Sequence, residues 1–250
     1  MSDPGFFAEV VEWFGDPAHW QGSSGIPARL VEHLILSAIP LAIATAIALP
    51  AAMYVGHTRR YELAIVTIAN IGRAIPSYAL LVIMVILTGL GNEPIIVALT
   101  LLAIPPILTN GYVAIQSVDA DTIEAARGMG LTGRQVLFGI ELPLGAPLLV
   151  AGLRIAALQI VATAGLAALV AGGGLGRFIV DGLAVRDFPR VFSGALLVAI
   201  LAGLTEGAFS LLQRWATPRH GVRRTARGLP AEQPPGAHRL VGPLDRPRPT

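Results

Sequence analysis

The stretch LVEHLILSAIPLAIATAIALPAAMYV, residues 30–55, decides the fold class of this chain. It is apolar over nearly its whole length, and a helix that crosses the hydrocarbon core of a bilayer needs about 20 mostly apolar residues. An isolated strand cannot cross, because lipid offers no partner for its backbone N–H and C=O groups. This stretch therefore predicts a membrane-spanning helix.

Four further segments have the same character. The composition agrees with them: the chain is 54% hydrophobic and only 14% charged, with a mean hydropathy of +0.66, whereas soluble domains are about 25% charged. We therefore expect an all-α, polytopic helical membrane protein. The four segments cover approximately residues 61–90, 94–115, 144–170 and 191–212.

The segment at 61–90 is interrupted by Arg73 and Pro76, so it is read either as one crossing or as two. With one crossing, twelve arginines in loops and tail fall on one face of the membrane and four on the other. Positive residues concentrate on the cytoplasmic side. The pattern favours five spans over six, with the N-terminus outside and the C-terminus in the cytoplasm.

Both ends of the chain differ from the spans. Residues 1–29 are acidic, lack the basic start of a cleavable signal peptide, and are expected to form an external arm. Within the arm, residues 6–20 suit either a short interfacial helix or a solvated stretch. Residues 30–214 form the expected transmembrane domain, and the Arg- and Pro-rich residues 215–250 predict a disordered cytoplasmic tail.

The connection between the third and fourth spans, residues 119–143, is DADTIEAARGMGLTGRQVLFGIELP. Residues 119–129 suit a short helix capped by Asp121 or Thr122. Gly130 permits a turn, and residues 132–140 suit a second short amphipathic helix before Pro143 starts the next span. We expect a helix, a hinge and another helix against the membrane.

The spacing of this loop is E-A-A, three residues, G, nine residues, I, one residue, L-P. It resembles the EAA loop of the permeases of binding-protein-dependent ABC importers, which implies the type I permease fold of that family. There, the loop docks on a separate ATPase. The resemblance carries the ATPase-coupling role to Glu124, Ala125, Ala126, Arg127, Gly130, Ile140, Leu142 and Pro143.

Residues 72–81, 98–119 and 151–179 resemble the osmoprotectant branch of these permeases. The resemblance implies a solute such as glycine betaine, choline or carnitine. An importer of methionine or another amino acid, and a secondary transporter working without ATP, are the alternatives. The implied partners are a dimer of the ABC ATPase, a second permease subunit, identical or similar, an external solute-binding protein and the bilayer of a bacterial inner membrane.

Polar residues within the spans are candidates for the translocation path, although hydrogen bonds between helices explain such residues equally well. Two arginines are prominent because a charge in the membrane is costly. A functional role and local pairing explain Arg73 equally well, whereas Arg154 is expected to reach the headgroups. The path candidates are Asn70, Arg73, Ser77, Tyr78, Asn110, Gln159 and Thr163.

The sequence lacks the signatures of catalysis. It has no cysteine, its five histidines lack ligand spacing, and no Ser-His-Asp set stands out. The glycine-rich residues 171–179 lack the G-K-[ST] ending of a phosphate loop. We expect no catalytic residue, metal or cofactor in this chain, with ATP and Mg²⁺ on the partner ATPase, and no binding of nucleic acid.

Overall fold

A computed structural model describes residues 5–217, in which helices connected by short turns account for the structure. The expected tail lies almost entirely outside the described residues. The helices are α1 (Phe6–Gly15), η1 (Pro17–Trp20), α2 (Ile26–Thr58), α3 (Glu62–Ala74), α4 (Ser77–Thr88), α5 (Asn92–Gln116), α6 (Ala120–Gly128), α7 (Gly133–Val136), η2 (Leu137–Glu141), α8 (Leu142–Ala164), η3 (Gly165–Val170), α9 (Gly176–Val185) and α10 (Phe188–Ala216).

Four helical stretches of residues 5–217 are long and apolar enough to span a membrane: Ile26–Thr58, Asn92–Gln116, Gly133–Val170 and Phe188–Ala216. The pair α3 and α4 forms a fifth, bent by 88° at its break. Ile75 has an extended backbone, because a proline disfavours helical geometry at the residue before it. Pro76 itself has no N–H to donate to a helical hydrogen bond. The described residues therefore hold four candidate spans, or five if the bent pair counts as one span, so five crossings stay the prediction.

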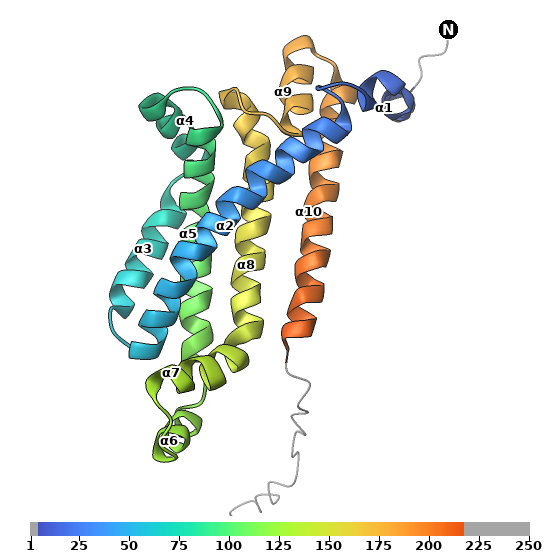
Figure 1. Cartoon of the computed structure of the whole chain (residues 1–250). Helices are drawn as coiled ribbons and strands as arrows, with labels where there is room; N and C mark the ends of the chain where they lie inside the picture. The colour runs from blue at the N-terminus through green and yellow to red at the C-terminus, as the bar shows by residue number, and fades with distance from the viewer. Residues whose placement is uncertain (1–4, 218–250) are drawn as a thin grey trace, which may run out of the picture. The chain divides into compact units, whose positions relative to one another are not determined.

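The helices separate two ends of the described chain (Figure 1). One, the α9 end, holds α1, α4 and α9; the other, the α6 end, holds α6, α7 and the last turn of α10. At the α9 end, α1 packs through aromatic edges: the Trp13 and Phe178 ring centroids are 5.4 Å apart, and those of Phe6 and Phe192 are 5.5 Å apart. The arm therefore begins as a helix seated on α9 and α10.

Three helices, α2, α5 and α8, form the core through small residues. Alanines at 44, 48 and 52 line one buried face of α2. A Cβ added at Gly111 of α5 would lie 2.8 Å from the Ala52 Cβ, and one added at Gly145 of α8 would lie 2.6 Å from the Ala114 carbonyl oxygen. Small residues let backbones approach closely, which is how helices associate in lipid.

The outer helices leave apolar side chains uncovered. In α10, only 6% of the most apolar window is buried, although its mean hydropathy is 2.0. Ile200 and Leu204 are exposed. Such a surface suits lipid or another membrane subunit, because lipid tails solvate apolar side chains as water does not.

A substitution at Gly145 tests the helix contact. We expect Gly145→Leu to lower the melting temperature of the detergent-purified chain by several degrees, because the new side chain meets the α5 backbone and overpacking costs about 1–3 kcal/mol. Gly203→Leu is the matched control, since a Cβ at Gly203 meets nothing within 4 Å. Equal melting temperatures for the two variants would refute this account of the core.

Candidate functional site: the loop between α5 and α8

The helix α6 begins with a side-chain cap. The carboxylate of Asp119 accepts a hydrogen bond from the Thr122 N–H at 3.1 Å. The expectation that Asp121 or Thr122 caps this helix is therefore wrong: α6 starts at Ala120, and both residues already lie within its first turn. Asp121 instead places a negative charge at the positive helix end, where it is favourable.

The end of α6 is closed by two backbone hydrogen bonds. The Gly130 N–H donates to the Arg127 carbonyl at 2.9 Å, and the Leu131 N–H donates to the Ala126 carbonyl at 3.2 Å. This is the Schellman pattern, which requires a left-handed residue after the helix. Gly130 supplies it with φ +88°, so the expected turn at Gly130 is present and has a conformational reason.

The second half of the loop is not a separate helix. Thr132 and Gln135 form a capping box that starts α7. From there the chain remains helical through one π turn, Leu137–Glu141, into α8. The π turn ends two residues before Pro143, whose missing N–H disturbs the hydrogen-bond ladder. The hinge expected at Gly130 is present, but the second short helix is continuous with α8.

The residues of the E-A-A stretch divide between two faces of α6. Glu124, Ala125 and Arg127 are exposed. Ala126, only 1% exposed, packs in a small core with Val118, Ile123 and Val136, against which Ile140 also lies. Ala125 is therefore the alanine that a partner protein can reach, whereas Ala126 holds α6 onto α7. Later in the loop, Leu142 is half-buried and Pro143 is exposed.

A hydrogen-bonded pair that the sequence did not reveal joins this loop to α2. The Nδ1 of His57 lies 2.6 Å from Oε2 of Glu141, whose side chain is 3% exposed. Both residues border a hollow of about 300 Å³, together with Arg59, Glu124 and Arg127. No sequence signal pairs His57 with Glu141, which are 84 positions apart.

The path candidates do not form one cluster within this subunit. Asn70, Arg73 and Tyr78 are exposed on the broken span, where Ser77 begins α4. Asn110 donates to the Pro106 carbonyl of its own helix at 2.8 Å. On α8, Gln159 is half-buried and Thr163 is buried. In the part of the chain that the structure describes, no hydrogen bond or ion pair joins these residues.

Arg154, which is expected from the sequence to reach the headgroups, pairs with α10. Its Nε donates to Oε2 of Glu206 at 2.6 Å, and its Nη1 donates to Oε1 of Gln213 at 3.3 Å. Gln213 in turn donates to the Pro147 carbonyl at 3.2 Å. An acid and a base in neighbouring spans neutralise each other's cost, and Glu206, the acid of the last span, was the available signal.

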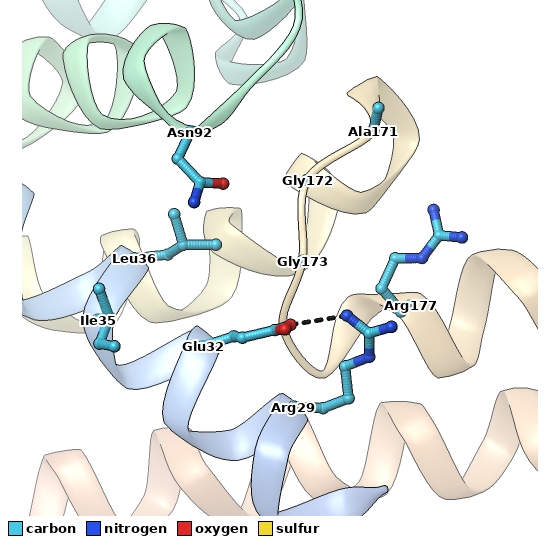
Figure 2. A pocket seen from close by; sticks show the side chains of 9 residues that line it. All are labelled: Arg29, Glu32, Ile35, Leu36, Asn92, Ala171, Gly172, Gly173 and Arg177. Atoms are coloured by element: carbon cyan, nitrogen blue, oxygen red, sulfur yellow. Dashed lines mark hydrogen bonds and ion pairs between the residues drawn. The ribbon is translucent and has the colours of Figure 1, made fainter. Parts of the chain in front are cut away.

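At the α9 end, a pocket of about 520 Å³ lies between α2, the start of α5 and the glycine-rich loop before α9 (Figure 2). Glu32 accepts from Arg29 at 2.7 Å and from the Gly174 N–H at 2.8 Å. A Cβ at Gly173 would lie 2.5 Å from the Glu32 carboxylate. The glycines therefore leave room for the carboxylate, whose hydrogen bond with the Gly174 N–H holds the glycine-rich loop against α2.

The neighbouring His33 also holds the glycine-rich loop against α2. It is fully buried; its Nδ1 accepts from the Leu175 N–H at 3.3 Å, so its Nε2 carries the proton donated to the Val161 carbonyl at 3.0 Å. Within residues 5–217, no group of three or more potential ligands gathers for a metal ion.

Comparison with known proteins identifies the family. Residues 34–219 match the family described as "Binding-protein-dependent transport system inner membrane component". The chain belongs to this family. The permease is 32% identical to the carnitine transport permease protein OpuCB of Listeria monocytogenes, over 88% of this chain and 98% of the relative.

Other relatives of the permease carry related names. It is 32% identical to the glycine betaine/carnitine/choline permease protein OpuCB of Bacillus subtilis, over 75% of this chain and 87% of the relative. It is 33% identical to the choline permease protein OpuBB of the same organism, over 78% of this chain and 90% of the relative. These similarities confirm the recognised family and its osmoprotectant branch.

The fold has solved counterparts. An inward-facing crystal structure of the MetNI methionine ABC transporter matches with a TM-score of 0.69 at 25% identity, covering 81% of this chain and 99% of that one. A second crystal form gives a TM-score of 0.70 at 27% identity. The expected ABC permease fold is thereby confirmed.

The cap of α6 is open to test by hydrogen exchange. We expect Asp119→Ala to speed exchange of the amides in the first turn of α6, since loss of such a cap costs about 0.5–2 kcal/mol. Asp119→Asn retains an acceptor oxygen and serves as the matched control, with exchange close to that of the unmodified permease. If the Ala and Asn variants exchange alike, Asp119 does not cap the helix.

Proposed function

We propose that this permease passes a small osmoprotectant across the bacterial inner membrane, driven by a separate ATPase that docks on the loop formed by α6 and α7. One observation carries this proposal. A short helix with the E-A-A spacing stands at one end of the five spans, and presents Glu124, Ala125 and Arg127 outward. The following helix, α7, continues helically into α8, which suits transmission of motion from the ATPase to a span.

The orientation follows from the same assignment. With α6 in the cytoplasm, the Arg59-Arg60 turn and the tail join it there, which satisfies the positive-inside rule. The α9 end then faces the solute-binding protein. ATP and Mg²⁺ belong to the ATPase dimer, and this chain contributes no catalytic residue, metal ligand or cofactor site.

A second permease subunit, identical or similar, completes the path. Asn70, Arg73 and Tyr78 are exposed on the bent pair α3 and α4, which passes as a span by length and composition. Exposure of an arginine to lipid is costly unless it reaches water or protein. We therefore assign these three residues to the face that meets the second subunit, where Asn110, Gln159 and Thr163 would contribute from behind.

The solute is a quaternary ammonium compatible solute, namely glycine betaine, carnitine or choline. This assignment is supported by the names of the relatives, which are about a third identical over most of the chain. Methionine is the second candidate, because the matching solved structures come from a methionine transporter. Selectivity by cation–π contact is expected in the binding protein, since this chain is only 6% aromatic.

Charge reversal on α6 tests the docking assignment. We expect Glu124→Lys to abolish capture of the co-encoded ATPase by the tagged permease and to abolish ATP-driven uptake in proteoliposomes. Glu12→Lys is the matched control, because Glu12 is an exposed acid on α1 at the opposite end and should leave capture unchanged. Normal capture and uptake with Glu124→Lys would mean that α6 is not the docking element.

Competition for uptake tests the solute. In proteoliposomes containing permease, ATPase and binding protein, unlabelled glycine betaine, carnitine or choline should suppress accumulation of a radiolabelled member of the same set. A hundredfold excess of methionine should not. Competition by methionine alone would replace the osmoprotectant by the amino acid while leaving the importer mechanism intact.

A further inference from the structure

The carboxylate of Glu141 occupies the one position in the I-x-L-P end of the loop to which the E-A-A pattern assigns no role. Its side chain is 3% exposed, and its hydrogen-bond partner is the imidazole of His57, at 2.6 Å. Burying a carboxylate costs several kcal/mol unless a partner compensates. A buried acid at a connector between spans therefore requires an explanation that general helix packing does not supply.

The pair joins elements that the chain does not connect directly. The loop at 119–143 is covalently continuous with α5 before it and α8 after it, whereas His57 lies in the last turn of α2. Within residues 5–217, the bond between His57 and Glu141 is the recorded side-chain hydrogen bond that links this loop to α2. Motion of the loop reaches α5 and α8 through the backbone, and this pair adds a direct side-chain contact between the loop and the end of α2.

The surroundings hold the pair in place. A Cβ at Gly133, at the start of α7, would lie 3.2 Å from Nε2 of His57, so the glycine leaves room for the ring. On the other side, Gly56 brings α2 against Ile115 of α5, where an added Cβ would lie 2.7 Å from the Ile115 Cβ. The imidazole thus lies between α7 and Glu141.

We propose that the hydrogen bond between Glu141 and His57 links α2 to the loop between α5 and α8, so that displacement of this loop by the ATPase moves α2 together with α5 and α8. Glu141 and His57 are positioning residues in this role, and the proposal rests on the proposed function of the loop. At its opposite end, α2 holds the glycine-rich loop through Glu32 and His33. The Glu141–His57 pair therefore connects ATPase docking to the α9 end of the permease.

The test measures solute molecules transported per ATP hydrolysed in proteoliposomes made from purified, ATPase-bound importer. Glu141→Leu fills the site without accepting a hydrogen bond, and we expect it to lower this ratio by about fivefold or more, in the range of coupling between distant sites. Glu141→Gln still offers an oxygen to the His57 N–H and should restore most of the ratio. A purely structural role would lower the yield of assembled importer and leave the ratio per assembled complex unchanged.

A double variant tests the link independently of charge. The chain has no cysteine, so His57→Cys with Glu141→Cys introduces a single thiol pair. We expect a low transport ratio before treatment and a restored ratio after reaction with a short bifunctional thiol reagent, compared with the same sample treated with a monofunctional reagent.

Two results would overturn the link: a wild-type ratio in assembled Glu141→Leu importer, or no recovery once cross-linking of the thiol pair is verified by mass spectrometry. Failure of the proposed function would give a different result, because the unmodified importer itself would then show no ATP-driven uptake of any tested solute.

Discussion

The close approach of the α2, α5 and α8 backbones is the constraint on which the remaining structure depends. In lipid, apolar side chains gain little by leaving solvent, so helices associate through packing. Ala52 against Gly111 and Gly145 against the Ala114 carbonyl supply that packing. Once these three helices are fixed, the loop from α5 to α8 has both ends held a short distance apart, and its compact α6–α7 arrangement follows.

Polar groups in the spans are handled by pairing across elements. Arg154 is neutralised by Glu206, which fastens α10 to α8, and Glu32 is held by Arg29 and the glycine-rich loop. The Arg154–Glu206 pair lies where two helices meet, and Glu32 joins a helix to a loop, so both add specificity to contacts that small residues alone leave loosely defined. The exposed Arg73 on the broken span has no such partner recorded within the described subunit, in keeping with a face completed by another subunit.

The α6–α7 loop combines an accessible face with a rigid base. Glu124 and Ala125 are free to meet a partner, whereas Ala126 and Val136 are buried beneath them. The turn at Gly130 separates α6 from α7, the small core packs the two helices together, and α7 continues through a π turn into α8.

The membrane class, the apolar segments and the short helix after residue 119 were predictable from the sequence, because each depends on local properties. The length of an apolar run, a proline at position 76 and the spacing from Glu124 to Pro143 are such properties. Tertiary structure alone decided that Arg154 meets Glu206, 52 positions away, and that His57 meets Glu141, 84 positions away. Such pairs depend on which helix faces are brought together, and that is decided by packing over the whole bundle.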